Sequence, residues 1–320
     1  MLRSHWRRLA AIVAVVALLL PAAALAADHY KGYPHGDALI SPQELKHMID
    51  AKDPNLLILA VANIAEYRVP GHIPGAIRVW RPDYEIPIGP NQPFEGMMLD
   101  REAFQAFARK FGVNNNTTLV IYDHQYDATR LWWGFFLYGK VAKVLDGGLQ
   151  GWKAAGYDTD MLAPSDPQPG NFTASAPRPG ITATMADVYK AKDNPQYQLW
   201  DDREPDEWTG AVLKKGAFRK GRIPWAHFLS WKEFKKPVAA GEKYTEFKTA
   251  DESRETIKKF GIDANKTQIF YCQSGVRTTT PIFILYMLGW DPTRTLNYDG
   301  SWIEWSYHKD NPVVVEAAEK

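Results

Sequence analysis

The two halves of this 320-residue chain repeat each other, and the repeat constrains the fold more than any other feature of the sequence. The sequence Gly-His-Ile-Pro at 71–74 has its counterpart in Gly-Arg-Ile-Pro at 221–224. Further along, the apolar runs that end in Asp123 and Cys272 correspond to each other in the same order. Self-similarity of this kind indicates a duplicated structural unit, so both halves are expected to fold alike.

Each half alternates short apolar runs with amphipathic segments. Apolar runs without polar alternation are typical of strands that are buried on both faces of a parallel sheet. The amphipathic segments, which are expected to form covering helices, are 101–111, 130–138, 252–260 and 279–288. We therefore predict an α/β protein with two tandem domains, each a parallel sheet with helices on both faces.

The domain boundaries follow from the repeat and from a stretch rich in proline and glycine. Residues 161–180 have little propensity for helix or strand, so they are expected to form an extended linker. The first domain is then expected over 38–160 and the second over 181–315.

The N-terminus has the pattern of an export signal. Three arginines within the first eight residues precede an uncharged run at 9–27, and the small-residue sequence Ala-Leu-Ala occupies 24–26. This pattern predicts a signal peptide over residues 1–26 and therefore a periplasmic or secreted protein. A retained membrane anchor is the alternative, although the apolar run is short and contains Pro21.

Charge and composition exclude several functions. The formal net charge of +1 gives no electrostatic basis for binding nucleic acid or an anionic membrane. A single cysteine can form neither an intramolecular disulfide nor a thiolate metal site, and the eight histidines have no paired ligand spacing. Glycine-rich phosphate motifs are absent as well, so neither a metal nor a cofactor is predicted.

The single cysteine, Cys272, follows an apolar run at 268–271 and begins a small loop that ends in Arg277. Ligands of parallel sheets bind at the carboxyl ends of the strands, where the N–H groups of a loop can converge on one point. These groups and the charge of Arg277 would favour the thiolate, which is the nucleophilic form of cysteine. The alternative is a buried cysteine that acts as a small apolar residue.

Several motifs occur in the same order along the chain: 71–76, 131–133, 144–149, 201–203, 221–224 and the loop 272–277. In this order and doubled, they resemble the rhodanese superfamily, specifically its tandem-domain thiosulfate sulfurtransferases. The resemblance implies that Cys272 in the second domain takes a sulfane sulfur from thiosulfate as a persulfide and passes it to a thiol or cyanide. It also implies that the first domain is non-catalytic. The expected partners are thus a small anionic sulfur donor and a thiol or cyanide acceptor, with a protein acceptor left open and no stable membrane insertion after cleavage.

Three other functions are alternatives to a thiosulfate sulfurtransferase. Four residues separate Cys272 from Arg277, whereas related phosphatase and arsenate reductase loops have five, so a phosphatase is disfavoured. A 3-mercaptopyruvate sulfurtransferase is an alternative, but Glu207 stands where those enzymes typically have an arginine for the substrate carboxylate. A third possibility is a non-catalytic exported module that carries sulfur or binds one partner protein.

The residues expected to bind the substrate around the nucleophile Cys272 are Gln273, Ser274, Gly275, Val276, Arg277, Arg203 and His72. Arg203 has Glu207 four positions later, so a structural ion pair is its simpler role. His72 lies in a turn, where a hydrogen-bonded structural role is the common one, and it gains interest only if the first domain faces Cys272.

Two features of the first half complete the expectations. Asp123 is the counterpart of Cys272, and its carboxylate is expected to hold its own loop through backbone N–H groups. The segment 81–98 is a long excursion that is expected to cover the cleft between the domains.

Overall fold

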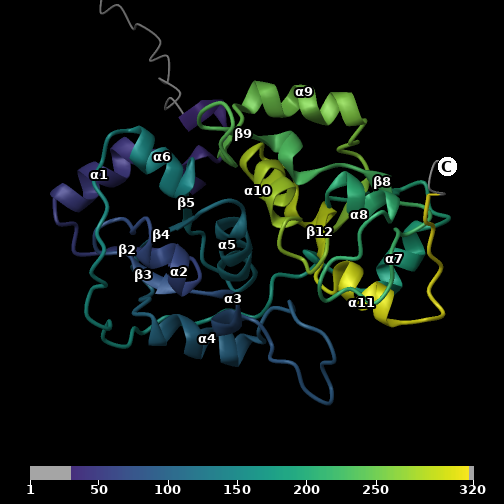
Figure 1. The fold of residues 1–320 in the computed structure, drawn as a ribbon, viewed down its shortest axis with the longest axis horizontal. Helices are drawn as coiled ribbons and strands as arrows, with labels where there is room; N and C mark the ends of the chain where they lie inside the picture. Colours follow the sequence, from purple (N-terminus) through teal and green to yellow (C-terminus); the bar gives the residue numbers. More distant parts are fainter. Residues whose placement is uncertain (1–29, 317–320) are drawn as a thin grey trace, which may run out of the picture.

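The computed structural model describes residues 30–316, which form two domains joined by an extended segment (Figure 1). The signal peptide expected at 1–26 lies outside the described residues. Within residues 30–316, no helix is long and apolar enough to span a lipid bilayer.

The first domain is built on a parallel sheet with the strand order β1-β5-β4-β2-β3. Its strands are β1 (Leu39–Ile40), β2 (Leu56–Val61), β3 (Ile77–Val79), β4 (Thr118–Asp123) and β5 (Lys143–Leu145). Its helices are α1 (Pro42–Asp50), α2 (Ile64–Arg68), α3 (Arg81–Tyr84), α4 (Arg101–Lys110), α5 (Asp127–Leu137) and α6 (Gly148–Ala154), and the short 3-10 helices η1 (Tyr30–Gly32) and η2 (Gly36–Ala38) precede them.

The second domain has a parallel sheet with the equivalent order β6-β12-β11-β7-β8 and a separate antiparallel pair, β9 and β10. Its strands are β6 (Thr182–Ala183), β7 (Tyr197–Asp201), β8 (His227–Phe228), β9 (Lys235–Pro237), β10 (Tyr244–Phe247), β11 (Thr267–Tyr271) and β12 (Thr295–Tyr298). Its helices are α7 (Met185–Ala191), α8 (Pro205–Thr209), α9 (Ala250–Phe260), α10 (Thr279–Met287) and α11 (Ser301–Tyr307), with the 3-10 helices η3 (Trp231–Phe234) and η4 (Pro292–Arg294).

The duplication extends to single hydrogen bonds. The N–H of Ile73 donates to the Tyr122 hydroxyl at 3.0 Å, and the N–H of Ile223 donates to the Tyr271 hydroxyl at 3.3 Å. The four expected helices form with small shifts at their ends, the largest at α5, which begins three residues early at Asp127. The predicted α/β fold with two tandem domains is confirmed.

Alternate residues of the strands build two apolar layers. In the first domain Leu59 and Ile121 face the core under α4 and α5, and the residues next to them face the core under α1 and α6. The first core continues without interruption into the second domain, where α10 packs beside α5 (Figure 1). At this contact the Trp132 ring meets the Phe283 ring edge-on, with 4.7 Å between centroids. The two domains therefore share one apolar core, whose burial stabilises their mutual placement.

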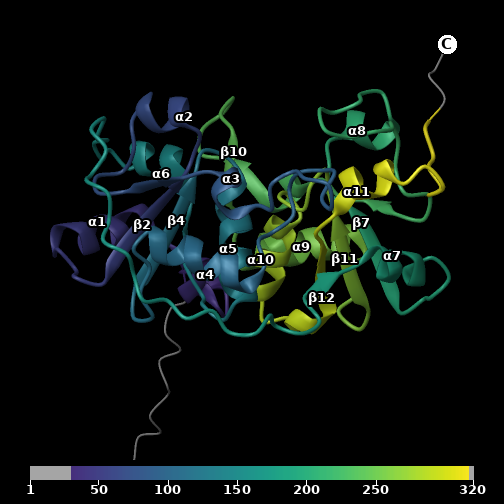
Figure 2. The same ribbon diagram turned by 90° about the horizontal axis from the view of Figure 1, so that it is seen from below.

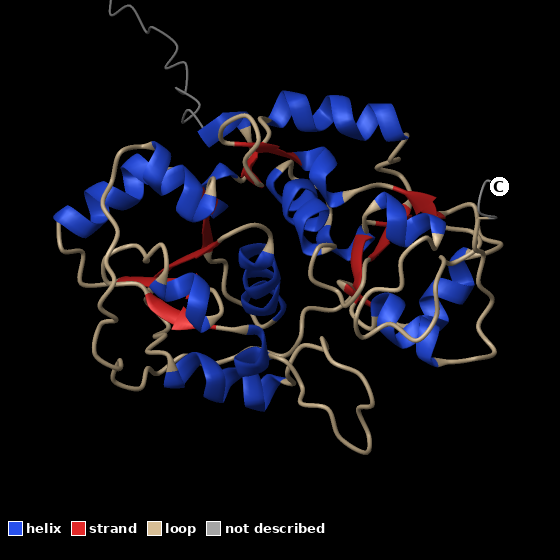
Figure 3. Cartoon of the chain, in the orientation of Figure 1, coloured by secondary structure: helices blue, strands red, loops and turns tan. Residues whose placement is uncertain are grey.

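The segment that joins the two domains is extended. Between α6 and β6 the chain contains neither helix nor strand (Figure 3). The N–H of Phe172 donates to the carbonyl of Val113, and the N–H of Ser175 donates to the carbonyl of Tyr138, both at 3.0 Å. These bonds hold the linker along the first domain.

The excursion after α3 crosses from the first domain to the second (Figure 2). The Phe94 ring lies 5.8 Å from the Tyr307 ring of α11. Gly96 approaches the loop after β11 so closely that a Cβ atom there would lie 2.6 Å from the Cβ of Ser274. The excursion therefore covers the interdomain region beside Cys272, as the sequence predicts.

Candidate active site

Cys272 lies at the carboxyl end of the central strand β11. Its neighbour in the sheet is β7, with Tyr271 in register with Asp201, and the ladder continues as the N–H of Asp202 donates to the carbonyl of Tyr271 at 2.8 Å. Cys272 and Asp202 are thus the first residues beyond two adjacent strands. The thiol is free and only 1% of Cys272 is exposed.

The loop is folded around the start of α11 by Ser301. The Ser301 hydroxyl accepts the N–H groups of Cys272 at 3.1 Å and Gly275 at 2.9 Å, and it donates to the carbonyl of Tyr298 at 2.7 Å. The carbonyl of Cys272 in turn accepts the N–H of Trp302 at 3.0 Å. Ser301 therefore fixes the shape of the loop and accepts the hydrogen bonds of two of its amides.

The remaining amides of the loop are available to a ligand. Among the described residues, no acceptor satisfies the N–H groups of Gln273, Ser274, Val276 and Arg277. The N–H of Gly275, one of the residues expected to bind the substrate, is instead bonded to Ser301. The φ of +70° at Gly275 and the carbonyl of Asp299, which would lie 2.8 Å from a Cβ, explain why this turn needs glycine.

Arg277 is held by a buried carboxylate. Its Nη1 and Nη2 lie 2.7 Å and 2.9 Å from the two oxygens of Glu207 on α8. Burial alone would raise the pKa of Glu207, but the hydrogen bonds and charge of Arg277 lower it to about 2. The charge of Arg277 is thus already balanced, and Lys214, about half exposed and 3.6 Å from Glu207, adds a second cation on the solvent side.

The expected pair between Arg203 and Glu207 does not form. Arg203 instead binds Asp201 through Nη2 at 2.7 Å and donates to the carbonyl of Gly221 at 2.7 Å. Its guanidinium lies over the Trp302 ring, 4.6 Å from the centroid. Arg203 is a buried structural residue that makes no contact with loop 272–277 among the described residues.

His72 is likewise placed away from the loop. Its ring stacks on Tyr67 at 3.9 Å, and its Nδ1 lies 3.2 Å from the carbonyl of Tyr67. Its backbone exchanges two hydrogen bonds with Asp160. The first domain does face the Cys272 loop, but within residues 30–316 no hydrogen bond or ion pair joins His72 to that loop.

The first domain supplies other residues to the site. The buried side chain of Arg130 on α5 donates to the carbonyls of Gly275 at 3.2 Å and Gly96 at 2.6 Å, and it lies 2.5 Å from Asp299. The Gln273 amide group donates to the carbonyl of Lys215 at 3.3 Å. We refer to residues 94–98 and 214–216, which close over the loop from the two domains, as the rim.

Asp202 is unusual among the residues near Cys272 because its buried carboxyl group has no hydrogen-bond partner among the described residues. The residue is fully buried. Burial, followed by the charges of Cys272 and Asp201, raises the pKa of Asp202 well above its ordinary value. Its position directly after β7 was visible in the sequence, but only the shared register with Cys272 reveals its importance.

The equivalent loop of the first domain is closed by its own side chain. The Asp123 carboxylate accepts the N–H groups of Gln125 at 3.0 Å and Ala128 at 2.5 Å, as the sequence predicts. Lys235 of the second domain donates to the carbonyl of Gln125 at 2.9 Å. This loop therefore has no cysteine, and the Asp123 carboxylate occupies two of its amides.

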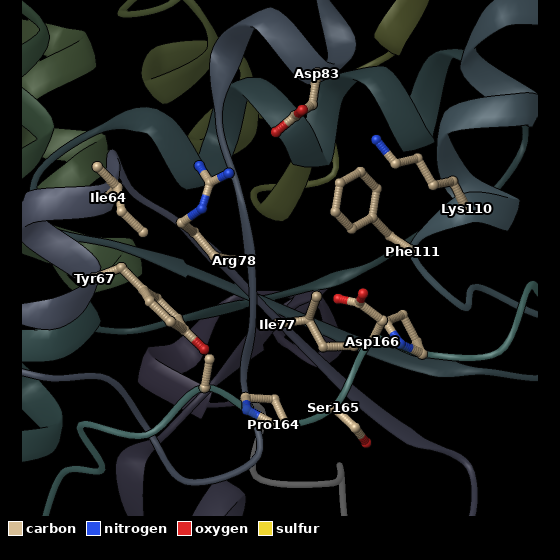
Figure 4. A pocket seen from close by; sticks show the side chains of 12 residues that line it. Ile64, Tyr67, Ile77, Arg78, Asp83, Lys110, Phe111, Pro164, Ser165 and Asp166 are labelled. Carbon is tan, nitrogen blue, oxygen red and sulfur yellow. The ribbon is translucent and has the colours of Figure 1, made fainter.

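A separate groove of about 500 Å³ lies on the first domain against the linker (Figure 4). Arg78 and Lys110 line it together with Asp83, Asp166 and apolar side chains. None of its lining residues belongs to loop 272–277. No group of three or more His, Cys, Asp or Glu side chains in the described part of the chain is suited to a metal ion.

Comparison with known proteins gives a consistent picture. The model of the rhodanese-like domain matches the chain twice, over residues 41–155 and 184–308. Both matches contain a complete parallel sheet apart from β1 and β6, which lie just outside them.

Three relatives span most of the chain. The sulfur carrier protein TtuD of Thermus thermophilus is 30% identical over 86% of this chain and 95% of that protein. A putative thiosulfate sulfurtransferase of Saccharopolyspora erythraea is 32% identical, with coverage of 73% and 82%, and the 3-mercaptopyruvate sulfurtransferase of Escherichia coli K12 is 31% identical, with coverage of 78% and 86%. The crystal structure of SseA from Escherichia coli, a 3-mercaptopyruvate sulfotransferase, superposes with a TM-score of 0.70 at 28% identity, covering 83% of this chain and 98% of that one.

Proposed function

The chain belongs to the rhodanese-like domain family, as a tandem-domain member, and from this premise we propose that it is a sulfurtransferase whose sulfur carrier is a persulfide on Cys272. One observation carries the proposal. The only cysteine of the chain ends the central strand of the second domain, beside four loop amides without protein acceptors among the described residues.

The proposed reaction has two halves. In the first, the Cys272 thiolate attacks the outer sulfur of thiosulfate, a new S–S bond forms, and sulfite leaves with the electrons of the old S–S bond. The four loop amides stabilise the terminal sulfur anion of the persulfide. In the second half, a thiolate or cyanide attacks that terminal sulfur, and Cys272 leaves as a thiolate, so the kinetics are ping-pong.

We propose thiosulfate as the donor in preference to 3-mercaptopyruvate. Relatives with either name match at similar identity, so overall similarity does not choose between them. Two local features support thiosulfate. Glu207 stands where 3-mercaptopyruvate sulfurtransferases typically have an arginine for the substrate carboxylate, and the nearly complete burial of Cys272 favours the smaller donor.

The test is a comparison of donors on the purified protein. Incubation with thiosulfate should raise the intact mass by about 32 Da, one sulfur atom, and cyanide or a thiol should reverse the change. Cys272→Ala should show no change in mass. An adduct with 3-mercaptopyruvate but none with thiosulfate would overturn the donor assignment. If neither donor formed an adduct, the proposal that the protein is a sulfurtransferase would be overturned.

A carrier role is the second candidate. It is favoured by the similarity to the sulfur carrier protein of Thermus thermophilus, which the chain matches over 95% of that protein's length. A carrier would form the persulfide but turn over slowly with cyanide or small thiols, and it would release its sulfur to a specific protein. Steady-state turnover with cyanide distinguishes the two roles.

We also propose that the protein is exported to the periplasm or secreted. The support is the sequence of residues 1–26, with its basic start, apolar run and Ala-Leu-Ala end. Mass spectrometry of the protein from exporting cells should find a mature chain that begins at Ala27. A full-length chain in the cytoplasmic fraction would contradict the proposal.

A further inference from the structure

The side chain of Asp202 is positioned beside the Cys272 sulfur by the sheet itself. The parallel ladder between β7 and β11 continues to the N–H of Asp202, so Asp202 and Cys272 share one register. Side chains alternate along a strand, and Trp200 and Phe270 both belong to the core that faces α10. Two residues further on, Asp202 and Cys272 therefore point to that same face from strands about 4.8 Å apart.

The carboxyl group of Asp202 has no hydrogen-bond partner among the described residues, and this includes the Cys272 sulfur. The residue is 0% exposed. The charged groups that face it are Cys272 and Arg277 from the loop after β11 and Asp201 from β7, and Arg277 is already paired with Glu207. From η3, the N–H of Trp231 reaches only the Asp202 backbone carbonyl, at 3.3 Å.

A buried carboxylate without partners is strongly disfavoured, so a carboxyl group in this place keeps its proton. A neutral carboxylic acid has one O–H to donate, and a buried donor needs an acceptor. The sulfur of Cys272 is the group whose charge acts most strongly on Asp202. Asp202 is therefore suited to hydrogen-bond a sulfur anion.

We propose that Asp202, in its protonated form, is a further catalytic residue that donates a hydrogen bond to the sulfur anion on Cys272, first the thiolate and then the persulfide. The proposal rests on the sulfur transfer proposed above. The Asp202 proton stays on its oxygen throughout: thiolate and thiosulfate become persulfide and sulfite, and the electron pair of each broken S–S bond leaves with the departing sulfur.

The equivalent pair of strand ends in the first domain has no counterpart of the Asp202 carboxyl group. In that domain Val61 pairs with Asp123 in the sheet register, and these two residues are the counterparts of Asp202 and Cys272. The Asp123 carboxylate there is satisfied by backbone amides alone. The acid next to the nucleophile thus occurs in the domain that needs to hold an anion on sulfur and is absent from the other.

The proposal predicts opposite results for two substitutions. Asp202→Asn keeps a neutral hydrogen-bond donor, so kcat/KM for thiosulfate near neutral pH should stay within about 3-fold of the wild type. It should also keep its activity at alkaline pH, where the wild type loses activity as Asp202 ionises and repels the dianionic donor. Asp202→Val, which copies Val61, removes the donor without leaving a polar group unsatisfied and should lower kcat/KM by about 100-fold.

The rate of Cys272 alkylation by iodoacetamide provides a readout that needs no sulfur donor. It should be preserved in Asp202→Asn and reduced about 10-fold in Asp202→Val, because the anion on sulfur loses its donor. Asp193→Asn, an exposed acid of the same domain, is the matched control and should leave both rates and the pH profile unchanged. Circular dichroism and thermal unfolding of each variant establish that it is folded.

Each outcome decides a different question. Equal rates and pH profiles for the wild type, Asp202→Asn and Asp202→Val would overturn the role of Asp202. An inactive but folded Asp202→Asn would overturn it too, because it would make the carboxylate a base. If the wild type forms no persulfide at all, the proposed function fails, whereas the alkylation series still tests the hydrogen bond from Asp202.

Discussion

The loops that follow β4 and β11 occupy equivalent places in two sheets of one topology, yet they use their amides differently. In the first domain the Asp123 carboxylate accepts the N–H groups of Gln125 and Ala128. In the second domain the Ser301 hydroxyl takes two amides and leaves the other four without described acceptors. The Asp123 carboxylate already occupies the position that an anionic ligand would take in the first loop. The two domains therefore differ in what their loop amides bind rather than in their fold.

The two loops are also held by buried cations from opposite domains. Arg130 of the first domain reaches the carbonyl of Gly275 and the Asp299 carboxylate in the second. Lys235 of the second domain reaches the carbonyl of Gln125 in the first. Each loop thus depends on its neighbour, and the candidate site is a product of the pair of domains.

The strongest test of this comparison moves the nucleophile. Cys272→Ala combined with Asp123→Cys places a single thiol in the first loop, beside Val61 and with Ala128 where the other loop has Arg277. We expect complete loss of the thiosulfate adduct in intact-mass spectra, because neither an acid nor a guanidinium accompanies the new thiol. A persulfide on the transplanted cysteine at the wild-type rate would show that position at the strand end is sufficient.

Removing the two interdomain cations should have unequal effects. Arg130→Met leaves the Asp299 carboxylate buried without its ion pair, so the free energy of unfolding should fall by about 3–5 kcal/mol. Burial lowers the pKa of Lys235, whose ammonium makes its hydrogen bond to a neutral carbonyl, and Lys235→Met should cost about 1 kcal/mol. Urea unfolding at neutral pH measures both, and equal losses would contradict the ranking.

The pair between Glu207 and Arg277 makes the second domain sensitive to acid. The folded pKa of Glu207 is about 2, against an ordinary value of 4.5, so its contribution is complete above about pH 4.5 and is lost as the pH falls towards 2. The shift corresponds to about 3 kcal/mol. Urea unfolding should show a deficit of this order for Glu207→Gln at pH 7 that shrinks near pH 3.

Lys214→Ala is the control for that experiment. The ammonium of Lys214 is about half exposed, so solvent screens its attraction to Glu207. This variant should therefore keep the acid-dependent loss of stability seen in the wild type. If the stability of Lys214→Ala did not depend on pH, the low pKa of Glu207 would be due to Lys214 and not to Arg277.

A further expected effect concerns the turn in which the two loops differ in shape. Gly275 has a φ of +70°, while its counterpart Tyr126 has a φ of −151°. Gly275→Ala should cost about 2 kcal/mol and reduce persulfide formation, because the new Cβ would meet the carbonyl of Asp299. Gly261→Ala, with a φ of +69° but open space around it, should cost only about 1 kcal/mol in the same unfolding assay.

The sequence was sufficient for the fold and for the position of Cys272 at a strand end. Repeated motifs and apolar runs report on backbone topology, which is why the two sheets, the extended linker and Cys272 at a strand end could be predicted. The role of Asp123 could be predicted too, because an aspartate that follows a strand bonds to nearby backbone amides.

The sequence was insufficient for the partners of the charged residues. Pairing Arg203 with Glu207 assumed a continuous helix, but α8 begins at Pro205, after Arg203. Glu207 is left to meet Arg277, which is distant in the chain, and Asp201 neutralises Arg203. Such contacts depend on how strand ends assemble in three dimensions, and no local spacing encodes them.

The enclosure of Cys272 by the rim has a consequence for timing. A sulfur atom loaded onto this thiol would be largely shielded from bulk solvent, since only 1% of the residue is exposed. The excursion lies against the same loop, where a Cβ added at Gly96 would be 2.6 Å from the Cβ of Ser274. An acceptor for the proposed persulfide would therefore have to meet Cys272 in a site that the first domain helps to enclose.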